Sequence, residues 1–413
     1  MDRQSGEWRA GWPVTLAGLI GVFILTQHFG ALGVLMKPLT ETFGWSRAQI
    51  SAGIMITAVV QCILIPLLGP IMNRIPLRRF ALGGALVYAA GLLAIAACSS
   101  NILTWYFGWA ILGLGIVGIS PVVWTMAVTR AFDRARGTAL AVALSGTGVS
   151  TLALPLLCAW IYEAHGWRAS VVALAVLELV ILLPALVLLM RHPAFGVDAT
   201  QKPTTQEPIA AAPTTALLRD RSLYLFILTA FLMAAAVGAM STHMQAILQD
   251  QGATPLAAAA YYSVAGPALI VGRLGSGFLL DRLPTKLVAT ILFAIPAATA
   301  TLLLSYDGSP AMGVLICLLL GLGYGAETDL FAYLCARYFR GADYPLAYSL
   351  TYSAYSISYG LAGVAGGAVF DRTGTYHLLL IGLIGGVVVA IALLQALGHR
   401  DRPEPVPAPD VTI

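Results

Sequence analysis

Charged side chains are scarce in this sequence: Asp, Glu, Lys and Arg make up 10% of its 413 residues, whereas 59% are hydrophobic. A soluble domain usually carries about a quarter charged residues, so the composition excludes an ordinary water-soluble fold. Apolar runs of about 20 residues recur along the chain, and each can cross a hydrocarbon core about 30 Å thick. Because open sheets leave backbone groups unsatisfied in lipid, we predict an all-α membrane protein.

Catalytic and metal-binding patterns are also missing from the sequence. There is no phosphate-binding glycine loop, no nucleophile elbow and no nucleophile–base set, so we expect neither an enzyme nor a bound cofactor or metal. The cysteines fall in apolar runs without a CxxC pair, which is typical of free thiols used as small apolar residues. They are Cys62, Cys98, Cys158, Cys317 and Cys335.

The apolar runs predict twelve membrane helices in two sets of six. Their approximate ranges are 12–36, 48–72, 80–98, 102–129, 138–162, 168–190, 222–248, 255–280, 286–305, 312–336, 345–370 and 377–397. The long interruption between the sets is rich in Pro, Thr, Ala and Gln, which is typical of a flexible connector. We therefore predict a six-helix bundle over 1–190, a cytoplasmic linker over 191–221, and a second bundle with a short cytoplasmic tail over 222–413.

Basic residues are distributed unevenly between alternate loops. One set of loops holds Arg74/Arg78/Arg79, Arg130/Arg134/Arg136 and Arg219/Arg221, and the other holds only Lys37, Arg47, Arg168 and Arg372. The positive-inside rule then predicts that both termini are cytoplasmic. The first apolar run is too long for a signal-peptide core and is expected to stay as a helix. The chain has two asparagines, neither in a glycosylation sequon, which favours a bacterial cytoplasmic (inner) membrane.

The second half of the chain repeats motifs of the first half at an offset of 208 positions. The pairs are residues 73–76 (NRIP) and 281–284 (DRLP), 113–115 and 321–323 (both GLG), Gly44 and Gly252, and Glu163/Gly166 and Asp371/Gly374. Parallel repeats of this kind place a substrate site near mid-membrane between the two halves. Alternating access then consists of one half rocking against the other.

The loop after the eighth span, "GSGFLLDRLPTK", resembles the helix 8–9 signature of the major facilitator superfamily. The matching residues are Gly277, Asp281, Arg282 and Lys286. The first-half counterpart, "GPIMNRIPLRR", keeps Gly69 and Arg74 but has Asn73 where the family usually has aspartate. The resemblance implies that these loops form charge contacts that hold the cytoplasmic side closed. Asn73 can hydrogen-bond there but cannot form an ion pair.

Other motifs resemble one branch of this superfamily, the bacterial monocarboxylate transporters and oxalate–formate carriers. "AFDRARGTALAVALSGTG" (131–148) is similar to the helix 4–5 signature of monocarboxylate transporters. "FGWSRAQIS" (43–51) and "GAETDLFAYLCARYF" (325–339) look like bacterial members of the branch. The resemblance covers essentially the whole chain, and it implies transport of a small organic acid. The glycine–proline pattern of drug exporters in helix 5 is not matched.

Arg273, in "ALIVGRLGSG", is the strongest single functional signal. An arginine within a span costs about 2.5–3.5 kcal/mol on insertion scales and usually marks a cavity, a pathway or a partner. Its planar guanidinium group can hold a carboxylate through two hydrogen bonds. The resembling family also binds substrate through an arginine of helix 8. We expect Arg273 to bind the substrate, with a structural ion pair as the alternative.

Two histidines are further candidates for substrate contact. His243 and Asp250 lie seven residues apart in the seventh span, so they share a helical face. A histidine can donate to a carboxylate and can take a proton near neutral pH, so Asp250 is a candidate for proton coupling beside it. An interfacial histidine that meets water is the alternative. His28 in the first span is a weaker candidate, and packing against another helix explains it equally well.

Tyrosines supply hydroxyl groups in the tenth and eleventh spans. Tyr324 is in the tenth span, and Tyr352, Tyr355 and Tyr359 share one face of the eleventh by their spacing. We expect Tyr324, Tyr352 and Tyr355 to line the substrate cavity, because an apolar wall with few polar groups suits a small organic acid. The alternative is a stripe of tyrosines that only joins helices.

Acidic residues interrupt two of the apolar spans. Glu327 and Asp329 point to opposite sides of one helix, because two residues correspond to about 200° of rotation. We expect Glu327 to face the cavity and to pair with Arg273 or carry the coupling proton, and Asp329 to tie the helix to a neighbour, although these roles can be exchanged. Thr328 is included as a substrate contact. Glu178, in the sixth span, is expected at the lipid-facing periphery.

These residues lead to one main hypothesis. We expect proton-coupled symport of a small monocarboxylate such as lactate or pyruvate, by a monomer whose partners are that solute, protons and the lipid bilayer, without nucleic acid. The open alternatives are a carboxylate exchanger of the oxalate–formate type, a small-molecule or drug exporter, and a substrate-sensing membrane receptor.

Overall fold

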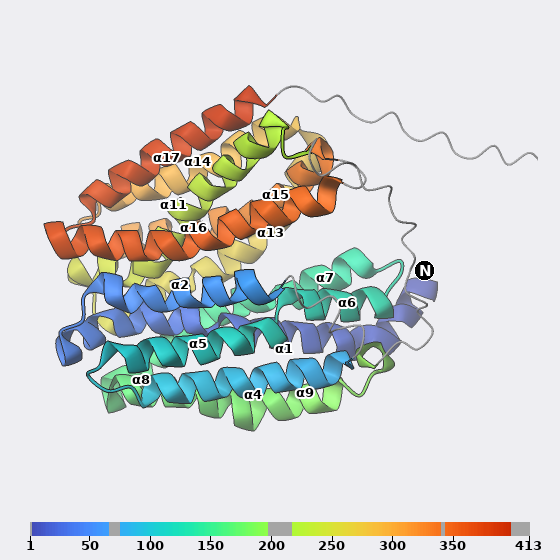
Figure 1. Ribbon diagram of the computed structural model, residues 1–413, viewed down its shortest axis with the longest axis horizontal. Helices are drawn as coiled ribbons and strands as arrows, with labels where there is room; N and C mark the ends of the chain where they lie inside the picture. Colours follow the sequence, from blue (N-terminus) through green and yellow to red (C-terminus); the bar gives the residue numbers. More distant parts are fainter. Residues whose placement is uncertain (1, 66–74, 197–216, 340–342, 398–413) are drawn as a thin grey trace, which may run out of the picture.

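The computed structural model describes residues 2–65, 75–196, 217–339 and 343–397, and in these ranges the chain is helical without a strand. Figure 1 shows the helices running roughly side by side in two groups, one formed by the residues up to 196 and the other by the residues from 217 onward. The predicted all-α class is therefore confirmed. The domain boundaries at 190 and 222 remain a prediction, because most of the predicted linker lies outside the described residues.

The first group contains α1 (Asp2–Phe43), α2 (Arg47–Leu64), α4 (Leu77–Ala96), α5 (Ile102–Gly118), α6 (Pro121–Ala131), α7 (Arg136–Leu144), α8 (Gly146–Val176), the π-helix η2 (Leu177–Leu182), α9 (Leu183–Leu189) and the 3₁₀-helix η3 (Pro193–Phe195). The second group contains α11 (Arg221–Asp250), α12 (Pro255–Ser263), α13 (Ala265–Arg282), α14 (Thr285–Leu304), α15 (Pro310–Tyr338), α16 (Asp343–Thr373) and α17 (His377–Ala396).

The described chain accounts for twelve crossings. Ten of its segments are long and apolar enough to cross a membrane. One of these, 136–189, reverses at Gly166, where φ is 82°. The Ser170 hydroxyl donates to the Cys158 carbonyl oxygen 2.9 Å away, which a continuous helix cannot allow at this separation, so the segment supplies two crossings. Helix α16, which packs along α11, supplies the twelfth.

Three of the predicted spans are broken in the structure. Helix α5 ends before α6 begins at Pro121, and the breaks at Ser145 and Val264 separate α7 from α8 and α12 from α13. Proline lacks the N–H that would continue a helix, which explains the first break. Irregular backbone inside a membrane protein is tolerated where it lines a cavity. Pro121 does line the cavity described below.

The turns at the end of the molecule opposite the N-terminus repeat between the two halves. Gly44 (φ 70°) precedes α2 and Gly252 (φ 97°) precedes α12, and such positive φ angles favour glycine. Two residues later, the Ser46 hydroxyl caps α2 and the Thr254 hydroxyl caps α12, each by accepting a backbone N–H. The predicted offset of 208 positions therefore corresponds to equivalent structure in the two halves.

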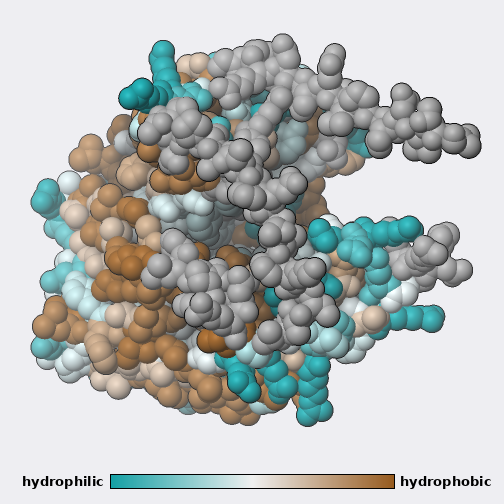
Figure 2. Space-filling model, turned by 45° about the vertical axis from the view of Figure 1, so that its right-hand side comes forward, coloured by the Kyte–Doolittle hydropathy of each residue, from teal (hydrophilic) through white to brown (hydrophobic). Residues whose placement is uncertain are grey.

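The two halves are joined at this end, which we call the closed end. Lys37 and Arg47 of the first half contact Asp250 of the second, at N–O distances of 3.6 Å and 2.6 Å. At the opposite end, on the side of the N-terminus, Figure 2 shows a notch between the two lobes, with hydrophilic side chains along its lower rim. The molecule is therefore closed at one end and open at the other.

Candidate functional site

A cavity of about 190 Å³ lies between the two halves. The first half contributes Leu25, Thr26, His28, Phe29, Ile54, Thr57, Ala58, Gln61, Ile116, Pro121 and Thr147, and the second contributes Leu269, Arg273, Tyr324, Tyr352, Tyr355, Ser356 and Tyr359. Most of this wall is apolar or aromatic, with a few hydroxyl groups. The described cavity wall carries one residue with a permanent charge, Arg273.

Arg273 reaches across the cavity from α13. Its Nη1 atom donates to the carbonyl oxygen of Leu144, 3.3 Å away, in the other half of the molecule. Leu144 is the last residue of α7, and the carbonyl groups at a helix C-terminus carry partial negative charge that attracts a cation. This contact places the guanidinium group between the two halves. The structure therefore places Arg273 at the cavity, and its role in binding substrate remains a prediction.

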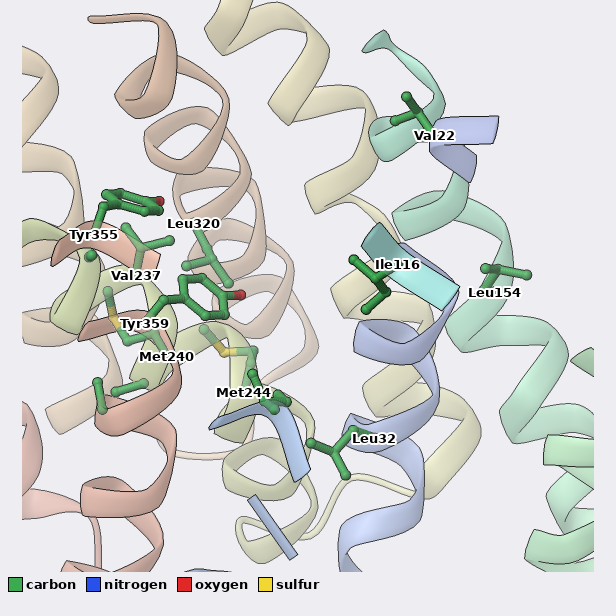
Figure 3. Packing of buried hydrophobic residues seen from close by; sticks show 14 of the residues in the cluster. Val22, Leu32, Ile116, Leu154, Val237, Met240, Met244, Leu320, Tyr355 and Tyr359 are labelled. Atoms are coloured by element: carbon green, nitrogen blue, oxygen red, sulfur yellow. The ribbon is translucent and has the colours of Figure 1, made fainter. Parts of the chain in front are cut away.

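The tyrosines of α16 form a continuous row on one face of the helix. The Tyr348 and Tyr352 rings stack with centroids 6.1 Å apart, and the Tyr352 and Tyr355 rings with centroids 6.3 Å apart. Tyr359 continues the row toward Tyr324 of α15, at 6.3 Å. Figure 3 shows Tyr355 and Tyr359 one turn apart, with their rings extended in the same direction. The row joins helices and also lines the cavity, so both interpretations of these residues apply.

His28 is in the cavity wall on the side of the first half. Its side chain is buried, and its Nδ1 atom lies 3.2 Å from the hydroxyl oxygen of Tyr88 in α4. The backbone N–H of His28 also donates to this hydroxyl, at 3.1 Å. His28 therefore lines the cavity as predicted and also packs against a neighbouring helix.

Glu327 lies behind the tyrosine row rather than on the cavity wall. Its side chain is 2% exposed, and its Oε2 atom accepts a hydrogen bond from the Tyr355 hydroxyl at 3.4 Å. Within the described part of the chain, Glu327 forms no ion pair, so the expected pairing with Arg273 is not found there. The side chains of Thr328 and Asp329 lie outside the described residues. The structure thus places one tyrosine between the cavity and the candidate acid.

His243 and Asp250 lie at the closed end and not in the cavity wall. Asp250 accepts two hydrogen bonds from the guanidinium group of Arg47, at 2.6 Å and 2.9 Å. Arg47 also donates to the Tyr376 hydroxyl at 2.8 Å, and this hydroxyl lies 3.0 Å from Nδ1 of His243. Both α11 residues therefore join one network, as their predicted shared face requires. His243 does not line the described cavity, and its predicted contact with substrate remains a prediction.

The hydrogen bonds of His243 define its tautomer. Nε2 lies 2.7 Å from the carbonyl oxygen of Gly363, which can only accept, so Nε2 carries the proton. The Tyr376 hydroxyl accepts from Arg47 and therefore donates its own proton to Nδ1 of His243. A neutral histidine satisfies every one of these contacts. A second ring proton would put two donors, Arg47 and His243, on the same hydroxyl.

Sequence reasoning missed three members of this network. Asp371 accepts hydrogen bonds from the backbone N–H groups of Arg47 and Ala48 at 2.9 Å and 3.0 Å, and so caps the start of α2 from the other half. Arg47 and Tyr376 were likewise not expected at a functional site. The signals were present, since Arg47 is in the motif "FGWSRAQIS" and Asp371 is a member of the repeat. We call Arg47, His243, Asp250, Asp371 and Tyr376 the closed-end network.

A second acid-to-helix contact mirrors that of Asp371. Glu163 of the first half accepts a hydrogen bond from the backbone N–H of Leu256, at the start of α12 in the second half, at 3.3 Å. Glu163 and Asp371 are related by the offset of 208 positions, and so are Ala48 and Leu256. The closed end is therefore held by two pseudo-symmetric contacts, each between a carboxylate and a helix N-terminus.

The predicted gating residues are described only in part. Gly69, Asn73 and Arg74 lie outside the described residues, as does the side chain of Asp281. Arg282 places its guanidinium carbon 3.5 Å from the centre of the Phe278 ring, and a side chain at Gly277 would meet no atom within 4 Å. The charge contacts that the signature implies remain a prediction.

The expectation for Glu178 is wrong. The side chain was expected at the lipid-facing periphery, but it is 0% exposed. It projects from η2, which contacts α1 and α4 of its own half. Hydropathy along the sequence reports that an acid interrupts an apolar run, but not toward which neighbour the acid points. Only the packing of the three segments shows that Glu178 is internal.

The described residues make twelve crossings in two pseudo-symmetric halves around a central cavity, and this architecture is that of a multi-pass membrane transporter. The family model described as Major Facilitator Superfamily matches residues 18–344, and the chain belongs to this superfamily.

The sequence similarity to named relatives covers nearly the whole chain. Monocarboxylate transporter 13 of Bos taurus is 25% identical over 404 residues, which cover 96% of this chain and 91% of the relative. The uncharacterized MFS-type transporter YcxA of Bacillus subtilis (strain 168) is 24% identical over 405 residues, which cover 95% and 96% of the two chains. The crystal structure of the nucleoside transporter NupG matches with a TM-score of 0.73 at 14% identity, over 93% of this chain and 98% of that chain, and shows the shared fold.

Proposed function

We propose that the protein is a secondary transporter that carries a small monocarboxylate, such as lactate or pyruvate, together with a proton. The observation that carries this proposal is the position of Arg273, the one permanently charged side chain in the described wall of a central cavity. One guanidinium group suits one carboxylate, which it can bind through two hydrogen bonds. The names of the relatives at about 25% identity support a monocarboxylate as the solute.

The size and lining of the cavity support a small solute. Its volume of about 190 Å³ is below the 300–1,000 Å³ range of pockets for drug-sized ligands. The stacked tyrosines present ring faces to the apolar part of the solute and hydroxyl groups to its oxygens. Of the alternatives, drug export therefore has the least support.

Proton coupling is proposed on energetic grounds. A negative interior opposes the entry of one anionic charge by about 2.3 kcal/mol per 100 mV. Transport of one proton with each anion removes this cost. We assign the proton to Glu327, because its carboxyl group is buried without a cation within ion-pair distance in the described chain, and Tyr355 connects it to the cavity. A carboxylate in such surroundings is costly unless it is paired or protonated.

The direction of opening completes the proposal. We infer that both termini are cytoplasmic in a bacterial inner membrane, so the open end faces the cytoplasm and the closed end faces outward. Substrate would leave through the notch seen in Figure 2. Return to the outward-open state requires the closed-end network and its Glu163 counterpart to separate.

The proposal is tested with purified protein in liposomes that contain a pH-sensitive dye. External lactate is expected to drive proton uptake in the unmodified protein. Arg273→Lys, which loses the two-point geometry, is expected to lower the rate at least about tenfold, which corresponds to about 1.4 kcal/mol. Arg273→Ala should lower it further, whereas Arg221→Lys, at an exposed arginine of α11, should not.

Two results would contradict this proposal. Lactate-driven proton uptake that persists in Arg273→Ala would remove the assigned carboxylate site. Lactate counterflow in buffered liposomes without any proton movement would replace symport with carboxylate exchange.

A further inference from the structure

A second buried acid lies in the first half of the molecule, away from Glu327. Glu178 is midway between Trp167 and Leu189, which mark the ends of the sixth crossing, so its depth is near the centre of the helix bundle. The side chain is 0% exposed, and neither carboxyl oxygen has a hydrogen-bond partner among the described residues. An unpaired buried carboxylate is costly, and acids at this depth usually serve a function.

The backbone around Glu178 is also irregular. Residues Leu177–Leu182 form a π-helix, in which the Leu183 N–H donates to the carbonyl oxygen of Glu178, five residues earlier. Pro184 follows and has no N–H to offer, so a regular α-helix cannot continue through this segment unchanged. Single π-helical turns are rare in proteins overall, and those that occur often lie at functional sites. The irregular turn lies against α1 and α4 of the same half, as well as against its chain neighbours α8 and α9.

A row of polar groups connects Glu178 with the cavity. The Tyr88 hydroxyl is fully buried and interacts electrostatically with the Glu178 carboxyl group. The same hydroxyl lies 3.2 Å from Nδ1 of His28 and accepts the His28 backbone N–H. His28 lines the cavity. The hydrogen-bonded part of the row therefore begins at the cavity wall and ends at the Tyr88 hydroxyl, in a helix that contacts η2.

No cation balances the charge of Glu178 among the described residues. The helices that contact η2 are α1, α4, α8 and α9. The titratable side chains nearest in these helices are His28, Tyr88, Cys158 and Tyr162, and α9 has none. The charged residues and His165 lie toward the helix ends: Glu7, Arg9, Lys37 and Glu41 in α1, Arg78 and Arg79 in α4, and Glu163, His165 and Arg168 in α8. Of these groups, Tyr88 is a fully buried side chain of α4, one of the helices that contact η2.

We propose that Glu178 is a second proton-binding site, which exchanges its proton with the cavity through His28 and Tyr88. A proton from cavity water binds Nε2 of His28, and the Nδ1 proton moves to the Tyr88 oxygen. The Tyr88 hydroxyl proton then moves to the Glu178 carboxylate, which swings to meet it. One proton enters, His28 and Tyr88 end neutral, and Glu178 ends as a carboxylic acid. The site does not depend on which solute the cavity carries.

The proposal is tested by infrared difference spectroscopy of the purified full chain during a pH titration, without substrate. The carbonyl stretching band of a protonated carboxylic acid is expected in the unmodified protein, and Glu178→Gln should remove one component of it. Glu41→Gln, at an exposed acid of α1, should remove none. A spectrum of Glu178→Gln that equals that of the unmodified protein at every pH overturns the proposal.

A second variant tests the connection to the cavity and does not alter the acid itself. Transfer into D₂O shifts the carboxylic acid band, and the rate of this shift reports proton exchange at Glu178. Tyr88→Phe removes the hydroxyl group and should slow the exchange at least about tenfold, while the band remains. An unchanged exchange rate would show that the row does not carry the proton. Because no lactate is added, either result is independent of the proposed symport.

Discussion

Glu327 and Tyr355 show how a single hydroxyl group can separate a cavity from an acid. The Tyr355 hydroxyl donates to one carboxyl oxygen of Glu327, and the other oxygen has no partner among the described residues. Of these two residues, Tyr355 is the one that lines the cavity, and it is 8% exposed. A proton that reaches Glu327 from the cavity must therefore pass this tyrosine or displace it.

Substitution of Glu327 should separate proton movement from solute movement. Glu327→Gln keeps the size of the side chain but cannot release a proton, so lactate-driven proton uptake is expected to disappear while lactate counterflow continues. Tyr355→Phe should reduce proton uptake several-fold. The two processes are measured in parallel, with a pH dye and with labelled lactate. Tyr333→Phe, at an exposed tyrosine of α15, is the matched control. Accumulation of lactate against its gradient by Glu327→Gln would refute the assignment.

At the residue scale, a charge that interrupts an apolar run indicates that a residue is unusual, but not where its side chain lies. Arg273 was found in this way and does line the cavity. Glu178 gave the same signal, yet its environment was misjudged, because the π-helix and the contacts with α1 and α4 are set by packing. Arg47 was treated as a loop residue, because its partners Asp250 and Tyr376 are more than 200 positions away along the chain.

At the scale of helices, the N-termini of α2 and α12 are the elements that join the halves. The backbone N–H groups at each N-terminus donate to a carboxylate of the opposite half, which is Asp371 at α2 and Glu163 at α12. An acid at a helix N-terminus typically contributes about 0.3–1 kcal/mol, and up to about 2 kcal/mol where it is partly buried. Two such contacts are enough to bias an equilibrium between states that differ by a few kcal/mol.

Removal of these two charges should favour opening of the closed end. Asp371→Asn and Glu163→Gln are each expected to populate a state with a longer distance between spin labels at Ser100 and Ser305, which lie next to the closed end in opposite halves. The double variant should show nearly the sum of the two free-energy changes, since the two contacts share no residue. Pulsed electron paramagnetic resonance measures the distances. Glu41→Gln should leave them unchanged, and an unchanged distribution in the double variant would rule out this role.

The sequence predicted the membrane spans, but it did not predict every break within them. Hydropathy placed all twelve, and the offset of 208 positions identified equivalent turns at Gly44 and Gly252. The breaks at Ser145 and Val264 were not predicted, although Gly146 and Gly148 follow the first break and Pro267 follows the second. The break before Pro121 had a visible signal. Helix α1 begins well before its predicted start, and Glu7 in this extension accepts backbone N–H groups of Arg134 and Ala135.

At the scale of the whole molecule, the ion pair between Arg47 and Asp250 joins the halves and is the most buried ion pair in the described part of the chain. Arg47 has 7% of its side-chain surface exposed and Asp250 has 25%. Loss of one partner from a buried pair typically costs about 3–5 kcal/mol, because the other charge stays uncompensated. A pair at the surface is worth about 0–1 kcal/mol. The contributions of a buried and an exposed ion pair to stability can therefore be compared within one chain.

Asp250→Asn is accordingly expected to lower the unfolding temperature far more than Asp133→Asn. Asp133 pairs with Arg136 at 3.6 Å, and its side chain is 92% exposed. Exchange of the partners, as Arg47→Asp with Asp250→Arg, should recover part of the loss. Thermal unfolding in detergent, followed by intrinsic fluorescence, measures all of these variants. Equal shifts for the two asparagine variants would indicate that the closed-end pair contributes little to the joined state.

The paired contacts of Glu163 and Asp371 also bear on how the closed end separates. They lie at equivalent places on the two halves, so a rigid rotation of one half strains both of them together. A hinge that opened only one side would break one contact and keep the other, and would have to bend a packed helix bundle to do so. Packed bundles resist gradual deformation and switch between discrete arrangements. We therefore expect the duplicated contacts to make the opening cooperative, an all-or-none event in which partly open forms are rare.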